Sequence, residues 1–138
     1  MFEQAAELTE IGAAIGIAGN STREFARLGL LDQLSAAATM PTELIYRDLR
    51  TGERVAAHPV ADGDWYVRRF GAPWFGLHRA DLQMILAGAF GGENLHLGCR
   101  LVDIVERADS VVVEFANGRV EEVDLVVGAD GVRSTVRP

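Results

Sequence analysis

Apolar residues recur with helical spacing most clearly between residues 78 and 92, in the sequence HRADLQMILAGAFGG. Positions i, i+3, i+4 and i+7 are all apolar there, being occupied by Leu82, Ile85, Leu86 and Ala89. Such spacing gives a helix one apolar stripe, and the Gly91-Gly92 pair that follows is typical of a helix end. The pattern therefore predicts a helix at 78–92 that packs one face against a core.

A shorter helix is predicted to begin near residue 20. Asn20 or Ser21 can cap it, and Glu24 stands three residues after Ser21, as in a capping box. Gly29 suits the C′ position that follows a helix. Beyond it an apolar face continues, in a short second turn or helix, through Leu30, Leu31 and Leu34.

Strand-forming residues are concentrated in two regions. Residues 43–59 alternate in polarity around Thr51-Gly52, which predicts a hairpin. Between residues 95 and 130, Asn117-Gly118 is a strong two-residue turn signal that joins SVVVEF to RVEEV. The sequence VDLVVGA at 123–129 is instead a nearly continuous apolar run, which is typical of a parallel strand covered on both faces.

Two segments leave more than one interpretation open. The segment 10–21 has too many glycines for a stable helix, so its backbone either lies against something flat or phosphorylated or forms a flexible loop. These glycines are Gly12, Gly16 and Gly19. The segment 60–76 is the most aromatic of the chain, and its rings either line a pocket or belong to the core. They are Trp65, Tyr66, Phe70, Trp74 and Phe75.

Composition narrows the class of protein. With 138 residues, 49% of them hydrophobic and 24% charged, the chain fits one soluble domain at most. A formal net charge of −7 argues against binding to nucleic acid or to an anionic membrane. The single cysteine, Cys99, excludes an internal disulfide and is expected to be a buried thiol. No apolar run approaches the ~18 residues of a membrane span and no signal peptide is evident, so a cytoplasmic location is expected.

Two charged residues occupy positions that suit a phosphorylated or hydroxylated ligand. Arg79 stands at the start of the 78–92 helix, where a cation opposes the helix dipole unless it meets an anion such as phosphate. A solvated arginine, or one paired with Asp81, is the alternative. Asp130 lies in the pattern Gly-Ala-Asp-Gly-x-x-Ser-x-x-Arg after the apolar run, where its carboxylate can accept hydrogen bonds from ribose or ribityl hydroxyls. As a bare Asp-Gly it would be only a turn.

Other residues with chemical potential give weaker signals. Glu3 suits the hydroxyls of an adenine ribose if it ends a strand, but alone it is typical of a surface acid. The three histidines, His58, His78 and His96, lack metal-ligand spacing. Ser134 lacks the strand-turn-helix elbow of a nucleophilic serine. Hydrolase and metalloenzyme functions are therefore not favoured.

Taken together, these segments resemble the FAD-dependent aromatic hydroxylases of the para-hydroxybenzoate and salicylate hydroxylase type. FEQAAELTEIGAAIGIAGNSTREFARLGLLDQL is similar to their segment from the end of the second strand through the next helix. LHRADLQMIL is similar to their His-Arg-x-x-Leu helix start, and DLVVGADGVRSTVR resembles their Asp-Gly motif, which serves both FAD and NAD(P)H. The resemblance covers essentially the whole chain in the order of the family.

The resemblance implies roles for individual residues. Glu3, with Gln4 beside it, would hold the adenosine ribose, and Leu101 would offer backbone groups to adenine. The loop from Gly12 to Gly19, which includes Gly16, would pass along the isoalloxazine and the substrate pocket. Arg79 would contact the pyrophosphate or the ribityl chain. Asp130 and Gly131 would support FAD and the transient NADH or NADPH. The resemblance nominates no catalytic residue and no metal site.

The implied fold is α/β, an incomplete FAD/NAD(P)-binding Rossmann-like domain over residues 1–138. A β-hairpin of the substrate-side sheet is inserted in it at 42–75. The family's first strand and glycine-rich loop would precede Met1, and its later Gly-Asp motif would follow Pro138. The chain thus resembles a central fragment of a longer protein, and by itself it is expected to bind FAD weakly and not to turn over.

The implied activity is that of a monooxygenase that uses FAD, NAD(P)H and O₂ to hydroxylate a small aromatic or related ring. The alternative is a non-catalytic remnant or interaction module that needs a complementing chain, and a homo-oligomer is a further option for its assembly. An NAD-dependent dehydrogenase is disfavoured because the Asp-Gly motif together with Arg79 suits FAD hydroxylases better.

Overall fold

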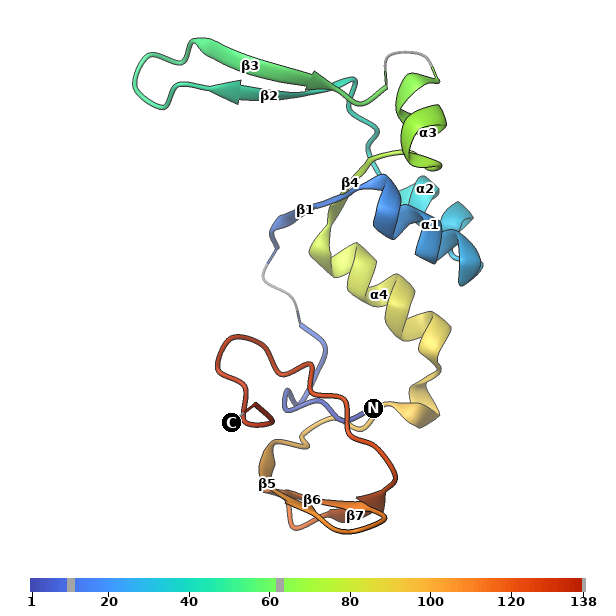
Figure 1. Cartoon of the computed structure of the whole chain (residues 1–138), viewed down its shortest axis with the longest axis vertical. Helices are drawn as coiled ribbons and strands as arrows, with labels where there is room; N and C mark the ends of the chain where they lie inside the picture. The colour runs from blue at the N-terminus through green and yellow to red at the C-terminus, as the bar shows by residue number, and fades with distance from the viewer. Residues whose placement is uncertain (10–11, 62–63, 138) are drawn as a thin grey trace. The chain divides into compact units, whose positions relative to one another are not determined.

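The strands form three separate antiparallel sheets, with helices between them in the sequence (Figure 1). This computed structural model describes residues 1–9, 12–61 and 64–137. The sheets are the pair β1 (Ala14–Ile17) and β4 (Phe75–His78), the pair β2 (Glu43–Arg47) and β3 (Arg54–Pro59), and a meander of β5 (Leu101–Glu106), β6 (Val111–Phe115) and β7 (Val120–Val123). The helices are α1 (Gly19–Arg27), α2 (Leu31–Ala37), α3 (Trp65–Phe70) and α4 (Arg79–Phe90), and the short 3-10 helix Gly92–Asn94 follows α4.

The mixed helical and strand content agrees with the predicted class, but the described part of the chain contains no parallel sheet. Every ladder between its named strands is antiparallel, and the parallel pairing found there is an isolated bridge between Phe2 and His96. A parallel ladder needs a second extended segment that runs beside the first in the same direction. Residues 10 and 11 of the predicted segment 10–21, residues 62 and 63 of the segment 60–76, and residue 138, which follows the Asp-Gly motif, lie outside the described residues.

The chain divides into two compact units. The first, Thr9–Ala89, is called here the helical unit, and the second, Met1–Leu8 with Phe90–Pro138, is called the meander unit. Each has a core of its own. In the helical unit the alternating residues of β1 and β4 carry the core, which consists of Ile17, Leu30, Leu34, Phe75 and Leu77. The predicted core stripe of α4 contributes Leu82 and Ile85, which are partly buried against this cluster.

Helix α1 begins earlier than predicted and without the predicted capping box. Its N-cap is Ala18, whose carbonyl accepts hydrogen bonds from the N–H groups of Ser21 and Thr22 at 2.9 and 3.0 Å. Ser21 is therefore already inside the first turn. The N–H of Gly19 donates instead to the hydroxyl of Tyr66, 47 residues away, at 3.3 Å. Because that partner comes from α3, no local pattern could have revealed it.

The C-terminal end of α1 agrees with the prediction for Gly29. This residue has φ +72°, and its N–H donates to Ala26 while the N–H of Leu30 donates to Phe25. These two bonds make a Schellman motif, which satisfies carbonyls that a helix end leaves free. Phe25 and Leu30 also share the core cluster, so the motif turns the chain directly into α2.

The predicted hairpin at 43–59 and the helix at 78–92 are both confirmed. Strands β2 and β3 pair across a turn in which Gly52 has φ +72°, and the main-chain N–H groups of Arg50 and Thr51 donate to the Asp48 carboxylate at 2.8 Å. Helix α4 occupies Arg79–Phe90 and is followed by Gly91 at φ +87°. In Figure 1 the hairpin extends away from α1 and α2.

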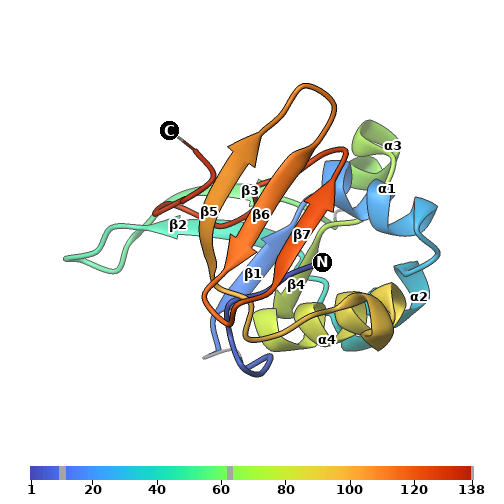
Figure 2. The ribbon, with the colours of Figure 1, turned by 90° about the horizontal axis from the view of Figure 1, so that it is seen from below.

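The meander unit follows the predicted strands as far as residue 123. Figure 2 shows β6 between β5 and β7, and the predicted Asn117-Gly118 turn joins β6 to β7, with Gly118 at φ +84°. Cys99 is buried, as predicted, with Val113 and Phe115. The ring of Phe2 lies 4.6 Å from that of Phe115, which ties the N-terminal segment to this core.

The predicted strand at 123–129 is not formed. Strand β7 ends at Val123, and Leu125 and Val127 are 76% and 80% exposed. A strand is stable only when its main-chain groups pair with a neighbour, and the described residues offer none to this segment. The run is apolar, as the sequence shows, but the prediction that it forms a parallel strand was wrong.

Substitution of Gly29 by alanine is expected to destabilise the helical unit by about 1 kcal/mol, because a Cβ disfavours the left-handed backbone. Gly88→Ala is the matched control, since Gly88 lies inside α4 with open space at its Cβ position. It should stabilise the same unit by ~0.5–1 kcal/mol. Urea denaturation followed by tryptophan fluorescence would measure both, and equal stability of the two variants would contradict the helix-end assignment.

Candidate functional site

The predicted site residues fall in both units. Gly12, Gly16 and Arg79 belong to the helical unit. The meander unit holds Glu3, Gln4, Leu101, Asp130 and Gly131. The structure thus assembles two local groups, each of which has its own geometry.

Glu3 is held by the parallel bridge at the start of the chain. Its N–H donates to the carbonyl of His96 at 2.9 Å, and its own carbonyl accepts from the N–H of Cys99 at 2.8 Å. One carboxylate oxygen, Oε1, accepts from the N–H of Ala5 at 2.8 Å. The side chain is therefore oriented by the main chain, and its second oxygen has no protein partner among the described residues. A carboxylate in this state can accept hydrogen bonds from a diol.

Two further predicted residues of the meander unit lie near the start of a strand or of the chain. Leu101 is the first residue of β5, is half-buried against the core and stands opposite Phe115. Since β5 is an edge strand of the meander, one row of its main-chain groups faces away from β6. Gln4 follows Glu3 and is exposed.

Asp130 is bound by its own loop. Its Oδ1 accepts from the hydroxyl of Ser134 at 2.6 Å, and its Oδ2 accepts from the N–H groups of Thr135 at 2.5 Å and Val136 at 3.1 Å. The Ser134 hydroxyl, followed by the N–H groups of Val136 and Thr135, lowers the pKa of Asp130 to about 2. Gly131, at φ +79°, makes the turn that brings these groups to the carboxylate. The Asp-Gly pattern therefore forms a structured loop, and the carboxylate is ionised at neutral pH.

Two glycines of the segment 10–21, Gly12 and Gly16, lie against flat rings, but these rings belong to the chain itself. Gly16 is in β1 rather than in a loop, and a Cβ added to it would lie 2.5 Å from the indole of Trp74. A Cβ on Gly12 would collide with the imidazole of His78. The expectation of a flat neighbour agrees with this geometry, whereas the expectation of a loop at Gly16 is wrong. Strand β1 forms because Ile15 and Ile17 gain a partner in β4.

Arg79 is the first residue of α4, as predicted. Its N–H donates to the carbonyl of Ala13 at 3.0 Å, which fixes the helix start to the end of the β1–β4 ribbon. The N–H of Ala80 donates to Nδ1 of His78 at 3.3 Å. The first turn of α4 is thereby locked to the strand that precedes it.

The aromatic segment contains both core and surface rings. Phe75 and Tyr66 are buried, whereas Trp65 and Phe70 are 40% and 38% exposed. Sequence reasoning did not identify the role of Tyr66 at α1 or the contact of Trp74 with Gly16. Of these two contacts, only the one between Trp74 and Gly16 had a signal in the sequence, because a glycine in a strand indicates close approach of another group.

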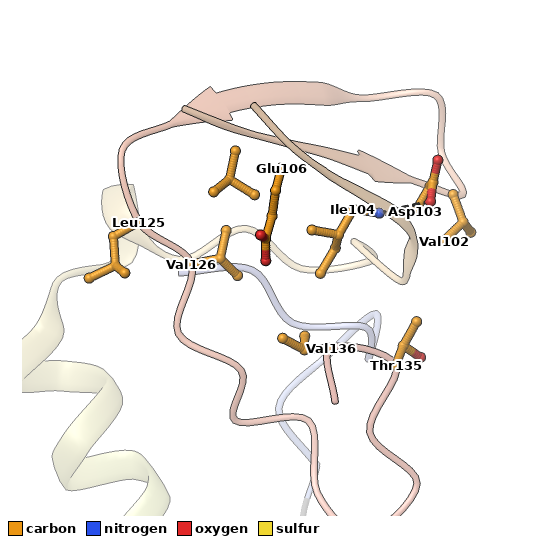
Figure 3. A pocket seen from close by; sticks show the side chains of 9 residues that line it. Val102, Asp103, Ile104, Glu106, Leu125, Val126, Thr135 and Val136 are labelled. Atoms are coloured by element: carbon orange, nitrogen blue, oxygen red, sulfur yellow. Dashed lines mark hydrogen bonds between the residues drawn. The ribbon is translucent and has the colours of Figure 1, made fainter. Parts of the chain in front are cut away.

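The meander unit also contains a cavity of about 540 Å³, which the sequence did not predict (Figure 3). Its walls come from β5 and β6, from residues 125 and 126, and from the closing loop at Thr135 and Val136. Glu106 and Asp103 supply acidic groups to a lining that is otherwise mostly apolar.

No group of three or more His, Cys, Asp or Glu side chains is placed to hold a metal ion in the described ranges 1–9, 12–61 and 64–137. Within the same ranges no helix has both the length and the apolar character needed to cross a membrane.

The hydroxyl of Ser134 donates a hydrogen bond to Asp130 and accepts one from the N–H of Arg137 at 2.9 Å.

Comparison with known proteins assigns the homologues of this chain to one class, the FAD-dependent monooxygenases of aromatic and heterocyclic compounds. No family model matches the chain. It is 36% identical to 3-amino-4-hydroxybenzoate 2-monooxygenase of Streptomyces cremeus over 137 residues, and 34% identical to 6-hydroxynicotinate 3-monooxygenase of Bordetella bronchiseptica. Each alignment covers 99% of this chain but 34% and 35% of the relative, so the chain spans about a third of the length of these relatives.

A solved structure supports the same relationship. The crystal structure of Klebsiella pneumoniae HpxO complexed with FAD and uric acid matches 99% of this chain and 34% of its own, with a TM-score of 0.82 and 30% sequence identity. The sequence motifs predicted a resemblance to FAD-dependent aromatic hydroxylases. The homologues of the chain are enzymes of that class, so this prediction is confirmed.

Gly16→Ala is expected to destabilise the helical unit by about 1–3 kcal/mol, because the new methyl group overlaps the indole of Trp74. In a Trp74→Ala background the same substitution should cost much less. A double-mutant cycle by urea denaturation measures this coupling. Additive effects of the two substitutions would contradict the contact.

Asp130 is expected to titrate near pH 2 in the folded chain, which ¹³C NMR of its carboxyl group would measure. Ser134→Ala should raise this pKa toward 3.8 by removing the strongest hydrogen bond, whereas Thr135→Ala, which keeps the main-chain N–H, should leave it unchanged. Since the folded pKa is the lower one, the loop is stabilised above pH ~4 and loses this contribution as the pH falls toward 2. An unchanged pKa in Ser134→Ala would contradict this assignment.

Proposed function

We propose that this chain forms part of the FAD-binding region of a monooxygenase that hydroxylates a small aromatic or heterocyclic ring with NAD(P)H and O₂. The observation that carries the proposal is the end-to-end similarity to enzymes of this activity, at 36% and 34% identity. The match in fold to a structure complexed with FAD and uric acid supports it. When bound, FAD would supply the redox and oxygen chemistry, and the chain would bind and orient it.

The proposed fold assignment is an incomplete Rossmann-like domain over residues 1–138, with a substrate-side β segment at 42–75. The parallel bridge between Phe2 and His96 supports this assignment, because parallel neighbours are characteristic of such domains. The projecting hairpin of β2 and β3 supports the separate role of the 42–75 segment.

Glu3 is the residue best suited to the ribose of the adenosine. Its carboxylate is oriented by Ala5 through one oxygen, and the other oxygen remains for the two hydroxyls of a ribose. Gln4 would lie beside the ribose, and Leu101 would offer main-chain groups of an edge strand to the adenine ring. The meander unit would thus bind the adenosine part.

Arg79, Gly12 and Gly16 would contact other parts of the cofactor. Arg79, placed at the first turn of α4, would neutralise the pyrophosphate or contact the ribityl chain. Gly12 and Gly16, which carry no side chain, would let the backbone approach the isoalloxazine. Their Cβ positions are closed by the rings of His78 and Trp74, so we expect these two rings to border the cofactor or the substrate.

Asp130 and Gly131 would serve FAD and the nicotinamide cofactor. The carboxylate is already oriented by Ser134 and by main-chain N–H groups, and Oδ1, which among the described residues accepts only from Ser134, can accept one further hydrogen bond. Its low pKa keeps it an acceptor at physiological pH.

In this proposal the cytoplasmic location predicted from the sequence is retained, and cell fractionation would test it.

A chimera tests the function directly. This chain would replace the matched third of the Bordetella 6-hydroxynicotinate 3-monooxygenase, and the purified chimera should retain stoichiometric FAD. With 6-hydroxynicotinate it should consume NAD(P)H and O₂ and form a product that carries one ¹⁸O atom when ¹⁸O₂ is supplied, which mass spectrometry would detect. A chimera that shows native-like circular dichroism but holds no FAD would overturn the proposal.

In this chimera, Glu3→Gln should weaken FAD binding by about tenfold or more, because a charged acceptor of a ribose hydroxyl is lost. Glu7→Gln is the matched control, since Glu7 is an exposed acid of the same N-terminal segment. Quenching of flavin fluorescence on titration gives both affinities. Equal losses in the two variants would argue for a general charge effect and against a ribose contact.

A further inference from the structure

The face of the β1–β4 ribbon that turns away from the core lacks side-chain volume at its centre. Ile17, Phe75 and Leu77 belong to the core cluster, so the residues that alternate with them lie on the opposite face. On that face Gly16 and Gly76 stand directly opposite one another. Two paired glycines leave a depression in the ribbon, which a neighbouring group can approach closely.

The indole of Trp74 fills this depression with one of its edges. A Cβ on Gly16 would lie 2.5 Å from Cζ2, 3.1 Å from Cη2 and 3.4 Å from Cε2 of that ring. The distances increase on both sides of Cζ2, as expected when the edge of a ring, rather than its face, points at the position. A Cβ on Gly76 would lie 3.5 Å from Cζ3 of the same ring. The two glycines therefore hold the edge of the indole, and their contact with it does not use its faces.

Trp74 differs from the other tryptophan of the helical unit in its aromatic contacts. The ring of Trp65 has three aromatic neighbours at 5.8, 6.2 and 6.1 Å, which are His58, Tyr66 and Phe70. Within the described residues the half-buried indole of Trp74 has no aromatic, cationic or hydrogen-bonding partner. Trp74 is therefore a large ring that is fixed at one edge and has no stacking partner in the described part of the chain.

The place of Trp74 in the ribbon indicates which part of the proposed site it would face. Arg79, proposed above for the pyrophosphate or the ribityl chain, follows β4 directly. Trp74 precedes β4, and an extended chain of this length puts it about 16 Å from Arg79. In the proposed function the ribbon would lead from the phosphates toward the ring system of the cofactor. Trp74 also lies near the end of the proposed substrate-side segment 42–75, which favours the substrate as its neighbour.

We propose that Trp74 is a specificity-determining residue of this monooxygenase, and that a face of its indole stacks on the ring of the substrate. Gly16 and Gly76 seat the edge of the indole and so fix the plane that the substrate meets. Stacking between two flat rings adds to the binding energy of their buried area, and a puckered ring of the same size does not gain this contribution. Trp74 therefore selects planar rings over saturated ones. This inference rests on the proposed function and adds how the substrate ring is recognised.

The test uses the FAD-loaded chimera described above and two matched ligands. They are 6-hydroxynicotinate and its saturated analogue 6-oxopiperidine-3-carboxylate, which carries the same oxygen, nitrogen and carboxylate groups on a puckered ring. The change in flavin absorbance on titration gives the two dissociation constants, and their ratio is the preference for the planar ligand. Trp74→Leu should lower this preference by about threefold to tenfold, whereas Trp74→Phe, which keeps an aromatic ring, should retain most of it.

Trp65→Leu is the matched control, because it removes the other tryptophan of the helical unit and should leave the preference unchanged. Circular dichroism and FAD content check that each variant folds and is loaded. If Trp74→Leu does not retain FAD, Trp74→Met removes the ring with a flexible side chain that fills irregular gaps. The same loss of preference is expected for that variant.

The possible outcomes separate this inference from the proposed function. An unchanged preference in an FAD-loaded Trp74→Leu or Trp74→Met variant would overturn the stacking contact and leave the proposed function intact. An equal loss in Trp65→Leu would also overturn it, since the effect would then belong to packing in general. Loss of FAD in both Trp74→Leu and Trp74→Met would assign Trp74 to the fold or the cofactor instead of the substrate. A parent chimera without FAD would contradict the proposed function and, with it, this inference.

Discussion

The pairing of β1 with β4 is the interaction on which the helical unit depends. Each strand has only four residues, and each places apolar side chains on one face and small or polar ones on the other. The pair therefore becomes stable only when Ile17, Phe75 and Leu77 are covered by the residues that follow α1. Through this pairing, segments some sixty residues apart become neighbours. Tyr66 then reaches the start of α1, and Arg79 is fixed beside Ala13.

The same constraint explains how much of the fold the sequence could predict. Features that depend on neighbours in the chain were predicted correctly, among them the Asn117-Gly118 turn, the glycine at the end of α1 and helix α4. Features that depend on distant partners were not. The start of α1 is set by a phenol from α3, and the apolar run at 123–129 has the composition of a strand but no neighbour to pair with.

The candidate site was predictable to a similar extent. Local pattern indicated that Asp130 and Gly131 belong to a motif that offers a carboxylate to a ligand hydroxyl, and the structure adds that Ser134 of the same motif binds the carboxylate. Position in the sequence identified Arg79 as a helix start. The contact of Gly16 with Trp74 could not be predicted, because a glycine signals close approach without naming the group that approaches. The separation of the predicted residues into two units was also beyond local pattern, since it follows from which segments pack together.

The distribution of a few side chains gives each unit an optical or chemical probe of its own. Both tryptophans, Trp65 and Trp74, and both tyrosines lie in the helical unit, so absorbance and emission from these rings arise there alone. The meander unit contributes nothing to tryptophan or tyrosine absorbance and emission. It holds the single thiol of the chain, which is buried at Cys99. A thiol reagent can label Cys99 only when that core opens, so the labelling rate follows local unfolding of the meander unit. The native sequence thus permits the stabilities of its two halves to be followed separately, without introducing a tryptophan or a cysteine by mutation.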